Sequence, residues 1–509
     1  MTGHGQRIRP GLVGAPADVD VVVVGLGATG AGVALDAVTR GLRVLAVDAH
    51  DLAFGTSRWS SKLVHGGLRY LASGQVGIAH ESAVERGVLM EVTAPHLVQP
   101  MPYVLPFTAS TSLADRALTR AGLRAADVLK LSARTSSATL PGPRTVSATE
   151  VARLAPGLRT AGLRGGILGW DGQLEDDARL VTTIARTAAA RGAVVRTRAR
   201  VLAATGTSAT LRDEVTGAVH EVRARAVVNA AGVWAGELVD EVELRPSRGS
   251  HLVLRGDVLP GLRTAVFAPI PEGRNRYVMV LPQPDGTLYV GLTDEPVEGP
   301  LPDVPAPSET EVGFLLDVVA ASFDRPLHRD DVVGSYAGLR PLLHTDDGST
   351  ADLSRRHAVL TSRTGVTTVV GGKLTTYRRM AQDALDQVGL GGPCTTATLP
   401  LLGAAPRAEL DALEQPTRLV RRYGADAALV LATARVATGL GDDELLAPVA
   451  DGVPTCLAEL VFGVTHEGAH DVDDLLDRRT RVGLVPADRA RALPAARRAL
   501  DLAAPARHR

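Results

Sequence analysis

Short, continuous apolar runs alternate with longer amphipathic stretches along this chain, a pattern that predicts buried parallel strands followed by covering helices. The run at 21–24 predicts a first buried strand, residues 31–40 a helix, and residues 42–47 a second buried strand. Apolar runs at 226–229 and 366–370 predict two further buried strands. The fold class expected from this order is α/β.

The turn between the first predicted strand and helix carries three glycines, Gly25, Gly27 and Gly30, in the pattern Gly-x-Gly-x-x-Gly. Gly25 permits a tight turn, Gly27 lets the backbone approach a pyrophosphate, and Gly30 lets helix and strand pack closely. Asp48 ends the second strand, where an acid can accept hydrogen bonds from a ribose diol. The motif predicts a dinucleotide site, but alone it does not separate NAD from FAD.

Segments far along the chain are predicted to return to this site. Residues 193–204 predict a meander strand, residues 226–234 a strand that enters a turn of small residues, and residues 366–377 a strand that ends in Gly-Gly before a helix. A cofactor domain assembled from such distant segments favours FAD, because NAD domains are usually contiguous. The cofactor contacts predicted in these segments are Val201, Ala231, Gly232, Gly371, Gly372, Leu374 and Thr375.

Composition narrows the classes of function. The 509 residues suggest two to four domains, and a net charge of -1 with 3% aromatic residues argues against a nucleic-acid partner. The two cysteines, Cys394 and Cys456, are too few for a disulfide framework or a zinc site, so a cytoplasmic setting is expected. We expect no metal. We interpret the acidic cluster 175–177 as a solvated helix start, and the charged stretch 473–481 as a helix face with i,i+4 pairing rather than a nucleic-acid patch. No apolar run approaches the length of a membrane-spanning helix.

Four motifs together resemble those of the FAD-dependent glycerol-3-phosphate dehydrogenases. They are Thr56–Leu71 (TSRWSSKLVHGGLRYL), Ala94–Val98 (APHLV), Gly338–Pro341 (GLRP) and Gly371–Tyr377 (GGKLTTY). The resemblance implies a discontinuous Rossmann-like FAD-binding domain of the glutathione-reductase or D-amino-acid-oxidase type, a mixed-sheet substrate domain and a helical C-terminal domain. The expected division is a disordered tail at 1–17, the FAD-binding domain at 18–240 and 345–395 with a helical rim insertion at 109–144, the substrate-binding domain at 241–344, and the C-terminal domain at 396–509.

The resemblance also assigns roles to individual residues. The stretch Ser60-Ser61-Lys62 is similar to the flavin-contacting loop of the family, and Lys62 and Lys373 are two of only three lysines in the chain. The arginines among the matching positions suit a phosphate, because forked guanidinium groups bind such oxyanions well. The positions that resemble those around glycerol phosphate in the family are Arg69, Tyr70, His251, Arg340, Arg355 and Lys373.

Oxidation of a secondary alcohol also needs a base for the hydroxyl proton, and histidine suits this role near neutral pH. His65 and His251 are both candidates, and the sequence does not choose between them. The predicted catalytic set is His65, His251, Arg340 and Lys373.

The implied reaction is oxidation of sn-glycerol 3-phosphate to dihydroxyacetone phosphate by hydride transfer to FAD, with electrons passed to a membrane quinone. Oxygen-using relatives share the flavin motifs, so a glycerol-3-phosphate oxidase that produces hydrogen peroxide is the alternative. A flavoprotein without turnover and an amino-acid oxidase of the same fold also stay open. We expect a cytoplasmic protein, and we leave open both peripheral contact with the inner face of the cell membrane and a homodimer.

Overall fold

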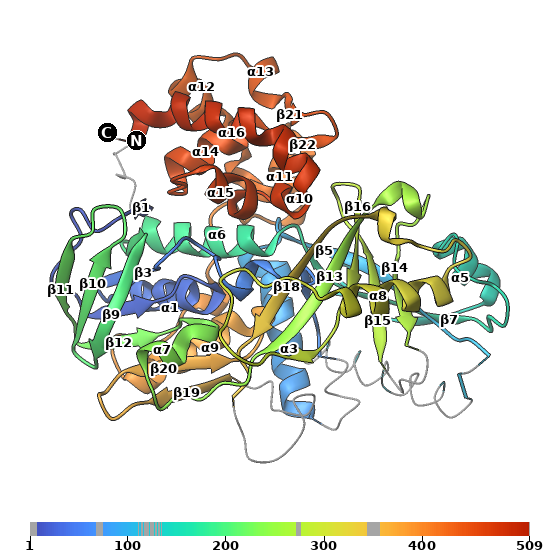
Figure 1. Ribbon diagram of the computed structural model, residues 1–509, viewed down its shortest axis with the longest axis horizontal. Helices are drawn as coiled ribbons and strands as arrows, with labels where there is room; N and C mark the ends of the chain where they lie inside the picture. Colours follow the sequence, from blue (N-terminus) through green and yellow to red (C-terminus); the bar gives the residue numbers. More distant parts are fainter. Residues whose placement is uncertain are drawn as a thin grey trace.

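The structure is a computed structural model that describes residues 8–67, 75–109, 135–270, 276–343 and 357–507, with single positions at 111, 112, 116, 122, 127, 130 and 133. These residues form an α/β body at the left of Figure 1, a body built on a large sheet at the right, and a helical body above. The α/β fold predicted from the order of apolar runs is confirmed.

A seven-stranded sheet forms the centre of the α/β body. In spatial order its strands are β1 (Ile8–Pro10), β8 (Val194–Thr197), β3 (Val44–Val47), β2 (Val21–Val24), β12 (Ala226–Asn229), β20 (Thr367–Gly371) and β19 (His357–Thr361). All neighbours are parallel except β19 and β20. β2 is buried on both faces, which explains its unbroken run of valines. The parallel register brings the turns after β2, β3 and β12 to the same edge of the sheet, where open α/β sheets bind ligands.

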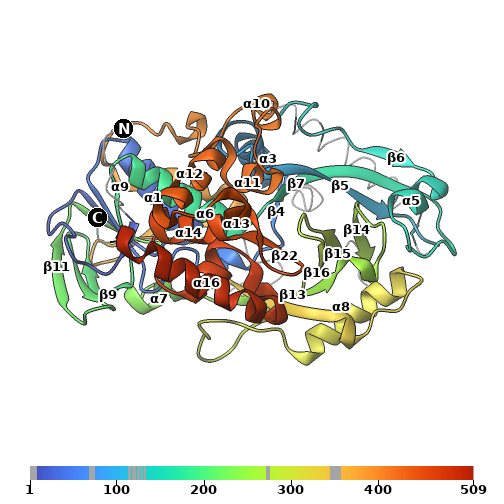
Figure 2. The ribbon, with the colours of Figure 1, turned by 90° about the horizontal axis from the view of Figure 1, so that it is seen from above.

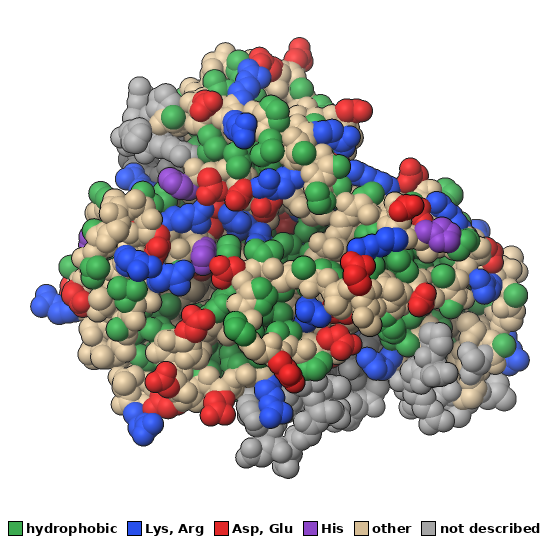
Figure 3. Space-filling model, in the orientation of Figure 1, with side chains coloured by type: hydrophobic (Ala, Val, Ile, Leu, Met, Phe, Trp, Pro, Cys, Tyr) green, Lys and Arg blue, Asp and Glu red, His purple; other side chains and the backbone are tan. Residues whose placement is uncertain are grey.

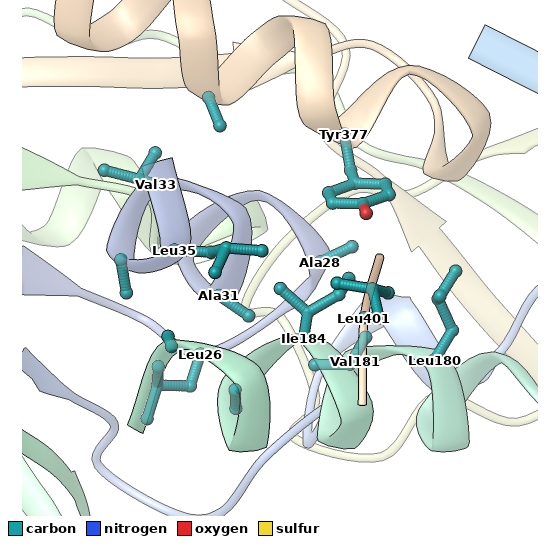
Figure 4. Close-up of a cluster of buried hydrophobic side chains, with 14 of the residues drawn as sticks. Leu26, Ala28, Ala31, Val33, Leu35, Leu180, Val181, Ile184, Tyr377 and Leu401 are labelled. Carbon is teal, nitrogen blue, oxygen red and sulfur yellow. The ribbon is translucent and has the colours of Figure 1, made fainter. Parts of the chain in front are cut away.

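Three helices cover one face of this sheet: α1 (Ala28–Thr39), α6 (Asp177–Ala190) and α9 (Tyr377–Val388). In Figure 4, Ala28 and Ala31 of α1 lie between Ile184 of α6 and the ring of Tyr377. Gly32 permits this close packing, because a Cβ there would lie 2.9 Å from the Tyr377 ring. The other face packs against a three-stranded meander, β9 (Ala199–Thr205), β10 (Ser208–Asp213) and β11 (Val219–Arg223).

The second body is built on a mixed sheet of ten strands. Eight of them follow one another across the sheet: β17 (Glu295–Pro296), β13 (Ser247–Arg255), β16 (Thr287–Gly291), β15 (Tyr277–Pro282), β14 (Ala265–Pro269), β5 (Val98–Pro106), β7 (Gly166–Leu174) and β4 (Leu63–Val64). The other two are β18 (Val332–Arg340), which pairs with β13, and β6 (Arg144–Val146), which pairs with β7. Strands β4 to β7 lie within residues 18–240, so the range predicted as the FAD-binding domain contributes strands to both large sheets.

The C-terminal body is helical, as predicted, with its own apolar core. Its helices include α10 (Arg407–Asp411), α11 (Thr417–Tyr423), α12 (Ala427–Thr438), α13 (Asp442–Leu446), α14 (Leu457–His466) and α16 (Pro486–Arg507). Figure 2 shows α12, α14 and α16 lying over the α/β body, and Figure 1 shows that α6 is the helix directly beneath them. A short hairpin of β21 (Pro448–Ala450) and β22 (Val453–Cys456) completes this body.

The predicted disordered tail at 1–17 is wrong for residues 8–17. β1 pairs with β8, and the N–H of Leu12 donates to Asp213 Oδ2 at 2.7 Å, so this segment is anchored at two points. Residues 1–7 and most of the predicted rim insertion at 109–144 lie outside the described residues.

The surface carries charges of both signs. Figure 3 shows acidic and basic side chains interspersed over one face of the molecule, in keeping with a net charge of -1. Within the described ranges, no helix has the length and apolar character needed to cross a bilayer.

Candidate functional site

The glycine turn joins β2 to α1 at the carboxyl end of the sheet. Gly25 has a φ of 93°, and a Cβ there would lie 2.6 Å from the carbonyl oxygen of Ala230. A Cβ at Gly30 would lie 1.8 Å from the carbonyl oxygen of Gly25. Both positions therefore require glycine, for the reasons that the sequence motif predicted.

The start of α1 forms a cradle for an anion. Gly27 is the N-cap, and a Cβ at this position would lie 2.9 Å from Ser57 Oγ. Ser57 Oγ accepts a hydrogen bond of 2.9 Å from the N–H of Ala28, and the glycine itself has no side chain to accept another. The backbone N–H groups of a first helical turn and the positive end of the helix dipole suit the pyrophosphate of FAD.

Asp48 holds the turn in shape. Its Oδ2 accepts a hydrogen bond of 2.8 Å from the N–H of Leu26, and its Oδ1 accepts one of 2.8 Å from the N–H of His50. Burial raises the pKa of Asp48 to about 6. Each carboxylate oxygen keeps a further lone pair, so the predicted contact with a ribose hydroxyl is compatible with these bonds.

The second helix start at the site follows β20. Gly371 and Gly372 have φ values of 77° and 73°, and a Cβ at Gly372 would lie 2.5 Å from the sulfur of Met380. Lys373 then precedes a short 3-10 turn at Leu374–Thr376 that leads into α9, and among the described residues no side chain caps this start. An uncapped helix N-terminus stabilises negative charge, which is what the edge of a reduced flavin presents.

Residues 55–67 contact elements of both large sheets. A Cβ at Gly55 would lie 2.8 Å from the ring of Trp234 in the turn after β12. Thr56 Oγ1 donates to the carbonyl oxygen of Leu339 in β18 at 2.6 Å. The segment therefore links the nucleotide sheet to the large sheet, and we call its residues 56–62 the flavin loop.

Lys62 fixes the shape of the flavin loop. Its φ is 57°, its side chain is 1% exposed, and its Nζ donates to Asp177 Oδ2 at 2.9 Å and to the carbonyl oxygen of Arg58 at 2.6 Å. The same Asp177 oxygen accepts from the N–H and the Oγ of Ser60 at 2.9 and 2.8 Å. The ammonium of Lys62 thus binds the loop itself, and its predicted contact with the flavin stays a prediction.

His251 on β13 is buried beside this loop. Its Nε2 lies 2.8 Å from Ser61 Oγ, and its ring stacks on Tyr336 of β18 with a centroid distance of 4.7 Å. Tyr336 in turn donates its hydroxyl to the carbonyl oxygen of Ser60 at 2.9 Å. Burial, with the charge of Lys62, holds the pKa of His251 well below its usual value, so the ring is neutral at physiological pH.

His65 has a different environment. Its Nδ1 lies 2.9 Å from Asp171 Oδ2 on β7, and 44% of its side chain is exposed. Asp171 Oδ1 accepts from Arg86 Nη1 at 2.8 Å and from the N–H of Gly66 at 3.3 Å. Burial acts to raise the pKa of Asp171, but Arg86 and His65 more than offset it, so the carboxylate stays ionised. Asp171 therefore orients the imidazole of His65 through Nδ1, and the other ring nitrogen, Nε2, faces away from the carboxylate.

Arg340 at the end of β18 is held in place by its neighbours. Its Nη1 lies 3.0 Å from Asp294 Oδ1 and 3.2 Å from Ser247 Oγ, and its Nη2 donates to the carbonyl oxygen of Thr293 at 3.3 Å. A Cβ at Gly249 would lie 2.2 Å from this Nη2, so the facing strand leaves the space that the guanidinium fills.

Lys373 lies close to the His65 side of the site. Its Nζ donates to Ser82 Oγ at 2.9 Å. Ser82 belongs to α3 (Val76–Val88), and a Cβ at Gly67 would lie 3.3 Å from Ser82 Cβ. The structure therefore places Lys373 next to the Lys-Leu-Val-His-Gly-Gly motif, and its predicted contact with the substrate stays a prediction.

The remaining predicted residues divide into two groups. Ala231 and Gly232 follow β12 beside the glycine turn, whereas Val201 of β9 packs against the core between the sheet and the meander. Their contacts with a cofactor stay predictions. The predicted substrate residues Arg69, Tyr70 and Arg355 lie outside the described residues.

Two charged clusters follow the sequence interpretation only in part. Residues 175–177 form a helix start, as expected, but they are buried rather than solvated. In the stretch 473–481 the expected i,i+4 pairing joins Asp474 to Arg478, and both residues are buried, whereas Asp473 is exposed. Asp176 caps α6 and is 1% exposed, as is Asp177. In the stretch 473–481, Arg479 is 0% exposed and its Nη1 lies 2.8 Å from Asp51 Oδ2 in the α/β body. Asp176 and Arg479 have partners in other bodies of the protein, Arg422 and Asp51, which a helical pattern in one segment cannot reveal.

Sequence reasoning missed several residues that shape the site. For Asp171 a signal exists, since it is the one charged residue in the strand Gly166–Leu174 (GILGWDGQL) and a lone carboxylate in an apolar strand needs a partner. For the others we find no comparable signal. The missed residues are Ser57, Ser82, Arg86, Asp171, Asp177 and Tyr336.

Known proteins resemble the chain over nearly its full length. Residues 20–378 match the family model "FAD dependent oxidoreductase", and residues 394–508 match "C-terminal domain of alpha-glycerophosphate oxidase". The chain is 51% identical over 495 residues to glycerol-3-phosphate dehydrogenase 1 of Mycobacterium tuberculosis, covering 95% of each chain. It is 33% identical to the mitochondrial glycerol-3-phosphate dehydrogenase of Arabidopsis thaliana, over 93% of this chain and 80% of the relative.

A solved structure shows the same architecture. The glycerol-3-phosphate dehydrogenase of Bacillus halodurans, complexed with FAD, superposes with a TM-score of 0.75 at 27% identity, covering 97% of this chain and 92% of the other. The predicted Rossmann-like FAD-binding fold with a mixed sheet and a helical C-terminal domain is thereby confirmed.

Proposed function

Because the chain belongs to the family of FAD-dependent glycerol-3-phosphate dehydrogenases, we propose that it oxidises sn-glycerol 3-phosphate to dihydroxyacetone phosphate with FAD as its cofactor. The substrate loses a hydride from C2 and a proton from the C2 hydroxyl, so two electrons leave with the hydride. FAD, when bound, supplies the acceptor for that hydride at flavin N5.

The observation that carries the proposal is the contact between His65 and Asp171. The carboxylate accepts the Nδ1 proton, which leaves Nε2 as the nitrogen that can take the hydroxyl proton. The exposed fraction of 44% gives the ring access to a substrate. We therefore assign the base to His65.

His251 supports the site in another way. Its ring is buried, neutral and hydrogen-bonded to Ser61 of the flavin loop, so proton uptake from a substrate is unfavourable. We assign it to holding Ser61 and the loop rather than to accepting the hydroxyl proton.

The cationic residues are proposed to stabilise negative charge on the substrate. Arg340 presents a fixed guanidinium, and Lys373 presents an ammonium beside the helix start at Gly371-Gly372. We assign Arg340 to the phosphate and Lys373 to the developing charge near the substrate oxygen. Arg69, Tyr70 and Arg355 are proposed to complete this pocket.

The test is anaerobic mixing of the purified protein with sn-glycerol 3-phosphate. Loss of the flavin absorbance near 450 nm supports the proposal. If FAD is bound but neither this substrate nor amino acids bleach it, the protein is a flavoprotein without turnover. If amino acids bleach the flavin instead, the protein is an amino-acid oxidase. Glycerol is the control, because it lacks the phosphate.

A membrane quinone is the proposed electron acceptor, and the support is that the relatives at 51% and 33% identity are named dehydrogenases. Oxygen is the alternative, because residues 394–508 match a domain named after an oxidase. A stopped-flow comparison of the reduced protein with a soluble quinone analogue and with oxygen distinguishes the two. We propose that the protein works in the cytoplasm at the membrane surface, which co-sedimentation with lipid vesicles tests.

A further inference from the structure

The start of α6 is the place where the flavin loop meets the C-terminal body. Asp177, the first residue of α6, binds Ser60 and Lys62 of the loop. Asp176, the residue before it, caps the helix by accepting from the N–H of Ala178 at 3.0 Å, and its Oδ2 lies 3.3 Å from Nη2 of Arg422 on α11. The start of α6 is therefore a junction at which Asp177 binds the flavin loop and the neighbouring Asp176 binds the C-terminal body.

Burial makes the charges of these two carboxylates interdependent. Each is 1% exposed, and each has a cation of its own, Lys62 for Asp177 and Arg422 for Asp176. Burial raises the pKa of Asp177, and the neighbouring charge of Asp176 raises it further. The charge of Asp176 therefore affects the protonation of Asp177, the residue that binds the flavin loop.

Other cations near Asp176 are already engaged. Arg179 is paired with Glu467, and Arg481 lies 3.0 Å from Asp285. Lys62 is the third cation that faces Asp176, and it is the partner of Asp177. Without Arg422, Asp176 would compete with Asp177 for Lys62 or share a proton with it, and in either case the loop would lose part of its anchor.

Arg422 is well placed to prevent this. Its side chain is fully buried, its Nε lies 3.0 Å from Glu459 Oε2, and its Nη2 donates to the carbonyl oxygen of Arg479 at 2.7 Å. The guanidinium is therefore fixed by the C-terminal body at the point where it meets Asp176.

We propose that Arg422 is a positioning residue for the flavin site, which pairs with Asp176 and so leaves Asp177 to bind Ser60 and Lys62. The C-terminal body then takes part in cofactor binding through this junction, although it contributes none of the predicted cofactor contacts. The inference rests on the proposed function only in taking residues 56–62 to face the flavin.

The test compares R422M with a matched control, R418M. Arg418 lies one turn earlier on α11 and contacts the same Glu459 at 2.7 Å, but its partners are Glu459 and Thr455 rather than Asp176. We expect R422M to raise the Kd for FAD about tenfold, because loss of a residue that orients a ligand weakens binding about 10-fold to 100-fold at metal sites. We also expect it to speed hydrogen exchange in residues 56–62. R418M should leave both quantities near the wild-type values.

A rescue variant separates a charge effect from loss of packing. Asn at position 176 keeps the cap on α6 but removes the charge, so R422M/D176N should bring the Kd for FAD back to within about threefold of wild type. A purely structural role for Arg422 predicts no rescue, and that result overturns the proposal. If R422M does not fold, the test is made with R422M/D176N. We expect this double variant to fold and bind FAD, and its failure to do so contradicts the proposal.

The outcomes distinguish this inference from the proposed function. Wild-type protein that is colourless and cannot be reconstituted with FAD contradicts the proposed function. Wild-type protein that binds FAD while R422M and R418M behave alike contradicts only the role of Arg422.

Discussion

His65 and His251 differ in the solvent access of their rings, and this difference determines which of them can exchange a proton during turnover. His251 is 2% exposed and packs against Tyr336, so protonation would place a charge in an apolar setting beside Lys62. His65 has a carboxylate partner and an open side. The same residue type thus serves two purposes within one site, and burial rather than sequence context separates them.

Substitution of Asp171 tests the orientation of His65. In D171N the amide can present its NH₂ group to Nδ1, which favours the tautomer with the proton on Nε2 and removes the base from the substrate side. We expect the rate of anaerobic flavin reduction at pH 7 to fall about 100-fold, the size of a general-base contribution. Stopped-flow absorbance measures it, and a D171N rate within about threefold of wild type would exclude this role for Asp171.

Arg340 is proposed to act mainly on the substrate phosphate. In R340A one charge-assisted contact worth about 1.5–3 kcal/mol is lost, so the KM for sn-glycerol 3-phosphate should rise about 10-fold to 100-fold with a smaller change in kcat. The Kd for FAD is the control, because a residue that binds only the substrate phosphate should leave cofactor binding near the wild-type value. A fall in kcat as large as the rise in KM would mean that Arg340 acts elsewhere.

At the level of elements, the parts that sequence reasoning predicted correctly are local ones. The strand at 21–24, the glycine turn and helix α1 lie next to one another in sequence, so periodicity and the glycine spacing suffice to identify them. The same holds for the strand and helix start around Gly371-Gly372.

The partners of the site residues depend on tertiary contacts instead. His65 meets Asp171 only because β4 pairs with β7, and Lys62 meets Asp177 only because α6 begins beside the flavin loop. Periodicity in a single sequence reports local structure only. It therefore cannot predict contacts between residues that lie more than 100 positions apart.

The contact between α1 and β2 gives a prediction at this scale. In G30A the new Cβ would lie 1.8 Å from the carbonyl oxygen of Gly25, so α1 must move away from the sheet and its N-terminus from the pyrophosphate. We expect at least a tenfold rise in the Kd for FAD, measured by quenching of flavin fluorescence. The matched control is G313A in α8 (Glu309–Ser322), where a Cβ meets no atom within 4 Å and FAD binding should not change.

Across the whole molecule, buried histidines make stability depend on pH. His96 lies where the α/β body meets the C-terminal body; it is 2% exposed, and burial lowers its pKa to about 3. A group whose pKa is depressed in the fold takes up protons first in the unfolded chain, so stability falls as pH drops below about 6.5. Burial lowers the pKa of His466 to about 4, with the same sign. The pKa values of Asp48 and Asp474 are both raised to about 6, and these two residues act in the opposite direction.

We therefore expect the free energy of unfolding to be lower at pH 5 than at pH 7. The share of His96 is about 2 kcal/mol, from 1.5 pH units at about 1.4 kcal/mol each. In H96Q the difference between the two pH values should shrink by about that amount, whatever the variant does to stability at pH 7. Urea unfolding followed by circular dichroism measures it, and an unchanged difference would contradict the assignment.

The ion pairs between the two bodies decide whether they unfold together. Glu467 on the C-terminal side binds Arg179 of α6, and both side chains are 0% exposed, so E467Q removes the ion-pair partner of a buried guanidinium. Removing one partner of a buried pair costs about 3–5 kcal/mol. E444Q is the control within the same body, because Glu444 pairs with Arg498 at the surface, where a pair contributes about 0–1 kcal/mol.

Because Arg179 belongs to the helix that also carries Asp176 and Asp177, the damage in E467Q should reach the cofactor. We expect the circular dichroism and flavin fluorescence transitions in urea to shift together to lower concentration in E467Q and to stay near the wild-type midpoint in E444Q. A flavin transition that stays in place while the circular dichroism transition shifts would show that the C-terminal body unfolds on its own. That result would also contradict a role for this body in FAD binding through the ion pair of Arg422 and Asp176.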